Sequence, residues 1–150
     1  MSDVSPSFPC ICARLRRTTR RVSQIYDRHL EPYALTISQF GVMAQVRVGD
    51  APSIGQLAER MVMDPTTLTR ALRPLERRGL LALTPDPADR RTRRLTLTEE
   101  GRALLRRARV GWEAAQAEVR AALGDEASLA LVAQLDGSLA RLGPVAAAAP

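Results

Sequence analysis

Hydrogen-bond donors gather on one side of a predicted helix that begins at Asp64. An aspartate followed by a proline suits a helix start, because the carboxylate accepts from free backbone N–H groups and proline lacks a donor that would be unpaired there. These donors can bind phosphate oxygens or base edges in the major groove of DNA. The polar face that carries them has hydroxyl and guanidinium groups and no acid: Thr66, Thr67, Thr69, Arg70 and Arg73.

The opposite face of this helix is apolar, with leucines at helical spacing, and Gly79 ends the helix. By itself, a basic amphipathic helix is also typical of a solvated surface. The preceding residues favour a nucleic-acid interpretation, because Ser53 and Gln56 have capping-box spacing and predict a short helix that ends near Arg60. Two short helices joined by a tight turn, with the polar face on the second, are the pattern of a helix-turn-helix.

A β-hairpin is predicted directly after the second of these helices. Residues 80–84 form a candidate strand, residues 85–93 are rich in proline and charge, and residues 95–98 alternate as a half-buried strand does. The tip carries Arg90, Arg91 and Arg93. An arginine-rich turn is also common as a solvated loop. Beside a recognition helix, however, it is typical of a wing that lies along the DNA backbone or places an arginine in the minor groove.

The distribution of charge supports this interpretation. The chain has 22 basic residues, all arginine, against 16 acids, for a formal net charge of +6. Residues 64–109 hold twelve of the arginines against six acids, whereas residues 110–150 hold two arginines against five acids. A positive field concentrated around the two predicted DNA-contacting elements is expected of a phosphate-binding face, although a solvated basic surface remains the alternative.

Composition excludes several other classes of protein. A chain of 150 residues with 45% hydrophobic residues is long enough for one globular domain with a real core. It has no apolar run near the length of a membrane span and no signal-peptide pattern, so we expect a cytoplasmic protein with no membrane partner. Two cysteines and one histidine make neither a disulfide scaffold nor an ordinary zinc site, and we expect no metal and no cofactor.

Long amphipathic helices flank the predicted DNA-binding part. Helices are expected over about 9–30, 36–48, 98–123 and 125–142, with Asp125 as the cap of the last one, a disordered start at 1–8 and a frayed C-terminal tail. The first and last helices have broad apolar faces, which fit an intertwined dimer, with a monomeric core as the alternative. We therefore predict a mainly α fold with a small β-hairpin wing, in one domain over residues 1–150. Its winged helix-turn-helix would cover about 53–100, and its helical dimerisation part about 9–34 and 102–142.

These patterns together resemble the multiple-antibiotic-resistance repressor (MarR) family of bacterial winged-helix regulators. The resemblance covers roughly residues 10–142, and the block that begins at Asp89 is the most diagnostic. It rests on Leu35-Thr36-Ile-Ser-Gln39-Phe40, Ile54-Gly-Gln-Leu57-Ala58, Asp64-Pro-Thr-Thr67-Leu68-Thr69-Arg70, Leu75-Glu-Arg-Arg-Gly79-Leu80, and Asp89-Arg90-Arg91 followed by Leu95-Thr-Leu97-Thr98-Glu-Glu-Gly101.

The resemblance implies a homodimer that binds double-stranded, pseudo-palindromic DNA, represses transcription, and releases the DNA when a small molecule or an oxidant acts. The two half-sites would lie roughly 34 Å apart. The five polar residues of the recognition helix would face the major groove, with Arg70 and Arg73 contacting guanines. Arg91 would enter the minor groove, held by a salt bridge from Asp89, and Arg90 and Arg93 would lie near phosphates.

The resemblance also directs attention to Cys12, which falls where the hydroperoxide-sensing branch of the family carries its reactive cysteine. The positive end of a helix and the nearby arginines would favour its thiolate. Cys10 and Cys12 would point about 200° apart on a helix, so a disulfide would join subunits rather than these two residues. That branch holds its cysteine with two tyrosines, of which only Tyr26 matches, since Ile37 occupies the other position. A buried structural cysteine, or an aromatic acid as the effector, is equally compatible.

Two alternatives come from other classes of protein. An architectural DNA-binding protein would have the same basic surface and would bind without sequence preference. A thiol peroxidase would use Cys12 as its nucleophile, but the sequence offers no His/Asp partner, no phosphate-binding loop and no metal-ligand cluster. We therefore predict that the chain is not an enzyme and has no catalytic residues.

Overall fold

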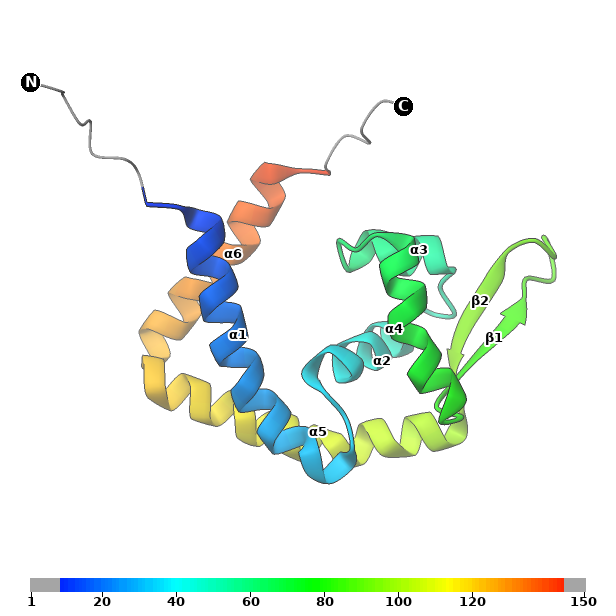
Figure 1. Ribbon diagram of the computed structural model, residues 1–150, viewed down its shortest axis with the longest axis horizontal. Helices are drawn as coiled ribbons and strands as arrows, with labels where there is room; N and C mark the ends of the chain where they lie inside the picture. The colour runs from blue at the N-terminus through cyan, green and yellow to red at the C-terminus, as the bar shows by residue number, and fades with distance from the viewer. Residues whose placement is uncertain (1–8, 145–150) are drawn as a thin grey trace, which may run out of the picture.

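The computed structural model describes residues 9–144. The predicted fold class is confirmed, because this part of the chain is mainly helical with a single two-stranded hairpin (Figure 1). The expectations for residues 1–8 and for the tail beyond 144 lie outside the described residues. The elements are α1 (Ile11–Leu30), the 3-10 turn η1 (Glu31–Tyr33), α2 (Ile37–Val48), α3 (Ile54–Arg60), α4 (Pro65–Arg77), β1 (Leu81–Pro85), β2 (Arg93–Leu97), α5 (Glu99–Leu123) and α6 (Asp125–Leu142).

Both predicted capping boxes are confirmed. The Thr36 hydroxyl accepts from the Gln39 N–H at 3.2 Å, and the Gln39 side chain accepts from the Thr36 N–H at 3.1 Å. Ser53 and Gln56 make the same reciprocal pair at 3.1 and 2.9 Å. Each box binds backbone donors that a helix start leaves free, so α2 and α3 begin at the residues that the sequence specifies.

The hairpin is antiparallel, with Leu81 opposite Leu97 and Leu83 opposite Leu95. Alternate residues of β2 point inward, and Leu95 and Leu97 are buried. The observed strands differ from the predicted ones by one or two residues at their ends. The difference arises because the ladder extends to Pro85 and Arg93, so the turn is shorter than composition indicates.

The core lies between α2, α3, α4, the hairpin and the first half of α5. Gly101 is required at the start of α5, because a Cβ there would overlap the carbonyl oxygen of Leu80. Gly79 follows α4 with φ of +68°, a left-handed conformation that glycine adopts without strain, as predicted for a helix stop. The largest fully buried side chains are Leu30, Met43, Leu57, Leu68, Leu72, Leu75, Leu95 and Pro52.

Helix α5 also packs against the C-terminal half of α1. Glu118 of α5 accepts from Arg28 at 2.5 and 2.6 Å and lies 2.7 Å from Nε2 of His29. Tyr26 donates to the side chain of Gln116. Gly111 permits this close approach, because a Cβ there would overlap the His29 carbonyl oxygen. The long helix α5 thus joins the winged module to the other helices.

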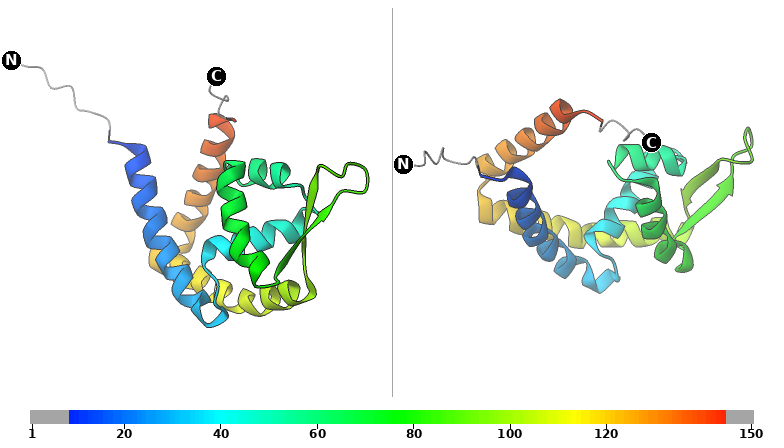
Figure 2. Two further views of the ribbon diagram at one scale, coloured as in Figure 1. Left: turned by 45° about the vertical axis from the view of Figure 1, so that its right-hand side comes forward. Right: turned by 45° about the horizontal axis from the view of Figure 1, so that its top comes forward.

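The N-terminal half of α1 is exposed, as is α6 except at the half-buried Ser128 and Gly137. Every residue from Ile11 to Arg21 is exposed, and α6 has no buried residue. Figures 1 and 2 show α5 running from the base of the hairpin to α6, which leaves α6 at the far end of the molecule. The prediction that Asp125 caps α6 is wrong: the N-cap is Gly124, and Asp125 is the first helical residue and pairs with Arg120 at 2.8 Å.

None of the helices in residues 9–144 is both long enough and apolar enough to span a membrane.

Candidate nucleic-acid interface

The predicted polar face of α4 is on the surface, opposite its buried face. Leu68, Leu72 and Leu75 are buried against the core, as their spacing predicts. Asp64 accepts from the Thr67 N–H at 3.0 Å and Pro65 is the first helical residue, which confirms the predicted start. The chain continues in helical conformation through Pro74. Thr66, Thr67, Arg70 and Arg73 are exposed and Thr69 is half-buried.

The hydroxyl groups of the three threonines on this face differ in their hydrogen bonds. The hydroxyl of Thr69 donates to the Pro65 carbonyl oxygen at 2.8 Å, and that of Thr67 lies 3.4 Å from the Asp64 carboxylate. The hydroxyl of Thr66 makes no hydrogen bond to any residue in the range 9–144. The donor of the Thr69 hydroxyl is therefore already used within the helix.

The arginines of α4 and of the hairpin tip carry charge that the protein does not neutralise. Within the described chain, acids pair with Arg28, Arg94, Arg102, Arg106, Arg109 and Arg120. Arg70 and Arg73 on α4 and Arg90, Arg91 and Arg93 at the tip are exposed and have no such partner there. Unpaired guanidinium groups are suited to phosphates and to the acceptors of guanine.

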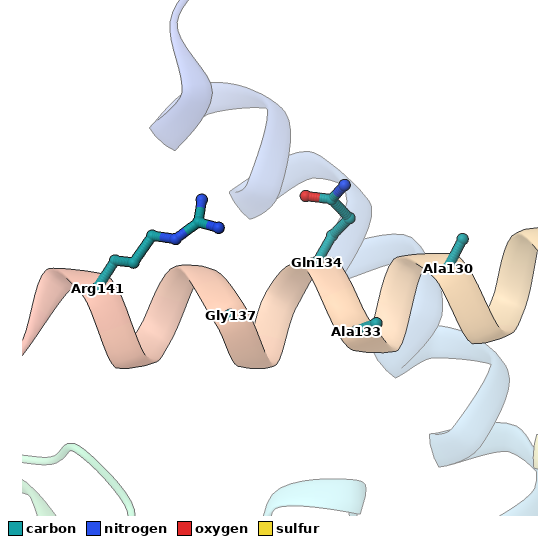
Figure 3. A pocket seen from close by; sticks show the side chains of 5 residues that line it. All are labelled: Ala130, Ala133, Gln134, Gly137 and Arg141. Atoms are coloured by element: carbon teal, nitrogen blue, oxygen red, sulfur yellow. The ribbon is translucent and has the colours of Figure 1, made fainter.

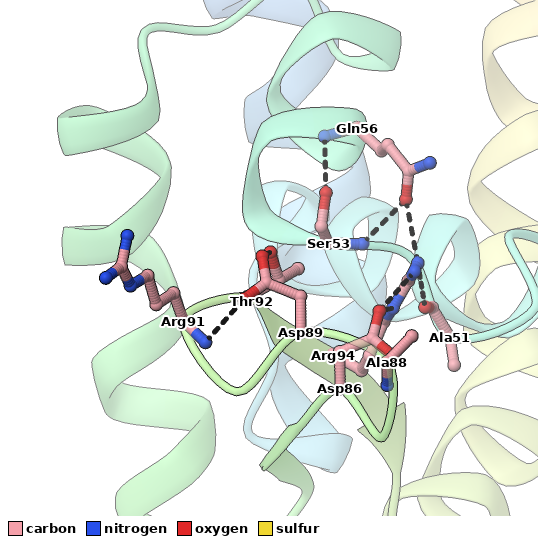
Figure 4. A network of polar contacts seen from close by, with 9 residues as sticks. All are labelled: Ala51, Ser53, Gln56, Asp86, Ala88, Asp89, Arg91, Thr92 and Arg94. Carbon is pink, nitrogen blue, oxygen red and sulfur yellow. Dashed lines mark hydrogen bonds and ion pairs between the residues drawn. The ribbon is translucent and has the colours of Figure 1, made fainter.

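Asp89 has a different role from the predicted one. Its carboxylate accepts from the Arg91 N–H at 3.0 Å and from the Thr92 hydroxyl at 2.9 Å. Figure 4 shows the Arg91 guanidinium pointing away from Asp89, so the predicted salt bridge between these side chains is wrong. Asp89 instead fixes the backbone of the turn, as short carboxylates do when they bind N–H groups two residues ahead. The tip arginine is thereby presented outward.

Sequence reasoning missed an ion pair where the strands of the hairpin meet its turn. Asp86 is buried, and its carboxylate lies 2.6 Å from Nη2 of Arg94. The Ala88 N–H and then the Arg94 guanidinium hold the pKa of Asp86 below its usual range by stabilising the carboxylate. The available signal was an acid at one end of the predicted turn and an arginine just beyond the other end. The pairing itself depends on the register of the hairpin.

The two cysteines lie at the start of α1, and both are free and exposed. Cys10 precedes the helix and caps it, with its sulfur accepting from the Ala13 N–H at 3.4 Å. The predicted angle of 200° between Cys10 and Cys12 therefore does not apply, because it required both to be helical. The alternative of a cysteine buried within its own chain is wrong for Cys12.

Tyr26 does not support Cys12 within one chain. The two residues are fourteen positions apart on the same helix, which corresponds to about 21 Å along its axis. Tyr26 bonds to Gln116 instead, and burial raises the pKa of its phenol. A contact between Tyr26 and Cys12 would need a second chain. Ile37, at the other predicted tyrosine position, is half-buried and its N–H donates to Asp27 at 2.7 Å.

No group of three or more His, Cys, Asp or Glu side chains in the described range is arranged to hold a metal ion. The interface is therefore defined by hydrogen-bond donors and positive charge.

A family model described as the MarR family matches residues 35–92, which cover the helix-turn-helix and most of the hairpin. The chain is 28% identical to the HTH-type transcriptional regulator SarZ of Staphylococcus aureus over 94 residues, or 63% of this chain. That match spans 64% of the length of SarZ, slightly less than two thirds.

Two solved structures extend the similarity over most of the chain. The M. tuberculosis transcriptional regulator MosR, crystallised in complex with DNA, is 36% identical, with a TM-score of 0.71 over 86% of this chain and 97% of that one. BpsR of Bordetella bronchiseptica is 29% identical, with a TM-score of 0.79 over 89% of this chain and 97% of that one. Its structure concerns the regulation of DNA binding by 6-hydroxynicotinic acid. A family of transcriptional regulators also agrees with the prediction that the chain is not an enzyme. From the fold and these similarities together, the chain belongs to the MarR family of winged helix-turn-helix transcriptional regulators.

Proposed function

We propose that this regulator binds double-stranded DNA in a sequence-specific manner. Helix α4 enters the major groove, where Arg70 and Arg73 contact guanines, and the hairpin tip places Arg91 in the minor groove, with Arg90 and Arg93 near phosphates. The observation that carries the proposal is the set of exposed, unpaired donors on α4 and the hairpin tip, opposite a fully buried apolar face. The complex of MosR with DNA supports it.

The same proposal includes a homodimer. Leu129, Leu135 and Leu139 of α6 are 71%, 44% and 54% exposed, which a lone chain gains nothing by exposing. The opposite side of α6 has a pocket lined by Ala130, Ala133, Gln134, Gly137 and Arg141, where the small side chains would let another helix approach closely. Figure 3 shows this pocket, with Gln134 and Arg141 on the same side of the helix. A twofold dimer would place two copies of α4 on two DNA half-sites roughly 34 Å apart.

The proposed regulation is repression that a small molecule relieves. Effector binding would favour a dimer in which the spacing of the two α4 helices no longer matches the half-sites, so the DNA is released. The regulation of BpsR by 6-hydroxynicotinic acid supports small aromatic acids as the effector class.

A redox signal is the second candidate, because Cys10 and Cys12 are both free and exposed at the start of α1. A hydroperoxide would oxidise the Cys12 thiolate to a sulfenic acid and would itself be reduced to the alcohol. A thiol from the second chain could then form a disulfide with that sulfur and release water. Dithiothreitol would reverse this oxidation.

The experiment is a fluorescence-anisotropy titration of the reduced protein against its own upstream DNA and against a shuffled duplex of equal length, at moderate salt. We expect tighter binding to the upstream DNA, since specific binding typically exceeds non-specific binding by 10³ or more, on the order of 4 kcal/mol. Equal affinity for both duplexes would contradict sequence-specific regulation and would favour an architectural protein.

Two additions to the same titration separate the signals. A panel of small aromatic acids, including 6-hydroxynicotinic acid, should weaken binding if the first mode of regulation holds. A stoichiometric organic hydroperoxide should release the DNA if the redox mode holds, and Cys12→Ser should then be resistant. Release by peroxide from the Cys12→Ser variant would contradict the assignment of Cys12.

A further inference from the structure

The one buried charged side chain of residues 9–144 is that of Asp86, which follows β1 where the hairpin enters its turn. Its backbone closes the turn, with its N–H donating to the Thr92 carbonyl oxygen at 2.8 Å. Its carboxylate accepts from the Ala88 N–H at 2.9 Å and from Nε of Arg94 at 2.7 Å. A buried carboxylate is stable only with such partners, so Asp86 depends on Arg94.

Arg94 in turn reaches beyond the hairpin. Its Nη1 donates to the side-chain oxygen of Gln56 at 3.2 Å and approaches the Ala51 carbonyl oxygen at 3.4 Å. Gln56 belongs to the capping box that begins α3, and Ala51 lies in the turn before it. One guanidinium group therefore joins the wing to the helix-turn-helix, as Figure 4 shows.

The backbone forms a second connection at the same place. The Leu95 N–H donates to the Pro52 carbonyl oxygen at 2.9 Å, and Ser53 forms a β-bridge with Arg94. The segment before α3 thus pairs with the outer edge of β2. A two-stranded hairpin is only marginally stable by itself, so these contacts determine the orientation of the wing.

We propose that Asp86 and Arg94 are positioning residues that hold the wing at a fixed angle to α3 and α4. The pair lets the tip arginines and the recognition helix meet one DNA duplex simultaneously, without contacting DNA itself. This inference rests on the DNA binding proposed above. It assigns to Arg94 a task different from that of the neighbouring arginines at the tip.

The decisive variant is Asp86→Asn, because a positioning role and a purely electrostatic role predict opposite changes in DNA affinity. If charge alone matters, the loss of an acid near DNA strengthens binding. If the pair positions the wing, the neutral amide weakens the contact to Arg94 and therefore weakens DNA binding. We expect about a tenfold loss of affinity, equivalent to about 1.4 kcal/mol.

Glu99→Gln is the matched control. Glu99 is exposed at the start of α5 and pairs with Arg102 at 3.1 Å, so this variant makes the same change of charge away from the Asp86–Arg94 pair. Its affinity for DNA should equal that of the wild type or exceed it slightly. Asp86→Asn binding as tightly as Glu99→Gln would overturn the proposal.

Hydrogen exchange of the DNA-free protein provides an independent measurement. The Leu95 amide, which bonds to Pro52, should exchange faster in Asp86→Asn and in Arg94→Lys, whereas amides within α4 should not change. Arg94→Lys keeps a positive charge but cannot reach Asp86 and Gln56 together. Unchanged exchange at Leu95 in both variants would overturn the inference.

The same measurements separate this inference from the proposed function. A wild type that does not prefer its upstream DNA would contradict the function and the positioning role together. If the wild type prefers its upstream DNA, and Asp86→Asn and Arg94→Lys bind that DNA as tightly as the wild type does, only the positioning role is contradicted.

Discussion

The winged module and the outer helices are both built from amphipathic helices. The chain buries the apolar faces of the module but leaves those of α6 exposed. In the module, Leu68, Leu72 and Leu75 of α4 are almost fully buried by α2, α3 and the hairpin. In α6, the leucines recur at similar spacing and remain exposed. An apolar helix face therefore predicts burial, but it does not show whether the same chain or a second chain covers it.

The exposed surfaces of the two regions also differ. The module leaves exposed guanidinium and hydroxyl groups, which suit DNA, whereas α6 leaves exposed leucine and valine, which suit a second protein chain. The exposed half of α1 has both kinds of side chain, with Ile11 and Leu15 among arginines. Each region is therefore matched to a different partner. Variants in each region test this division separately.

The largest expected difference is between Leu72→Ala and Leu135→Ala. Leu72 is 1% exposed, so its truncation should lower the free energy of unfolding by about 2–5 kcal/mol at every protein concentration. Leu135 is 44% exposed, and its truncation should act through dimerisation. Thermal unfolding over a hundredfold range of concentration checks both. An effect of Leu135→Ala that does not depend on concentration would place α6 in a core of its own chain.

Alanine substitutions at two glycines test the same difference between the two regions. A Cβ at Gly101 would overlap the Leu80 carbonyl oxygen, which is backbone and cannot yield, so Gly101→Ala should cost about 1–3 kcal/mol of stability. A Cβ at Gly137 meets nothing within 4 Å in the protomer. Alanine would stabilise an isolated helix there by about 0.5–1 kcal/mol. If a partner helix covers this face, Gly137→Ala should instead raise the dimer dissociation constant. Stabilisation at all concentrations would argue against that interface.

Within the module, Thr69 offers a finer test of how α4 meets bases. Because its hydroxyl already bonds to Pro65, we expect its methyl group, rather than its hydroxyl, to contact a thymine methyl. Thr69→Val, which keeps the methyl group, should preserve the base preference, whereas Thr69→Ser should relax it. Binding to a set of single-base operator variants measures this. The reverse order would show that the hydroxyl reads the base.

The smallest effect concerns the contact between α1 and α5, where Glu118 meets Arg28 and His29. Hydrogen bonds from His29 and then Arg28 hold the pKa of Glu118 below its ordinary value of 4.5. A carboxylate with a lowered pKa in the folded state stabilises the fold above the unfolded value and loses this effect as pH falls through the folded value. Glu118→Gln should therefore reduce the loss of stability below pH about 4.5.

Glu113→Gln is the control for that experiment, because Glu113 is exposed on the same helix and pairs with Arg109 within it. Thermal unfolding of the three proteins over a pH series gives the comparison. Identical acid profiles for the wild type and Glu118→Gln would contradict a role for this contact in joining α1 to α5.

Local signals in the sequence predicted most of the fold. The capping boxes at Thr36 and Ser53, the Asp64 cap and the Gly79 stop involve residues within a few positions of one another, and each is confirmed. The predicted cap at Asp125 is wrong because the preceding Gly124 already supplies the turn into α6. Element boundaries elsewhere differ by a few residues at most.

The side-chain contacts of the site were less predictable. Arg94 meets Gln56, which is 38 positions away, and only the pairing of the segment before α3 with β2 brings them together. Asp89 could bind either the Arg91 side chain or its N–H, and the shape of the turn favours the N–H. Residue type alone also does not reveal that the Thr69 hydroxyl bonds within the helix.

The most direct test of the division between the two regions is the base preference of α4. Wild type, Arg70→Ala and Arg106→Ala should be titrated in parallel against the upstream DNA and a shuffled duplex. Arg106 is exposed on α5 and lies 3.6 Å from Glu99, so its variant is the matched arginine control. We predict that Arg70→Ala loses preference for the upstream DNA, by about 1–3 kcal/mol, whereas Arg106→Ala keeps it. Uniform weakening of both duplexes by Arg70→Ala would contradict base reading by α4.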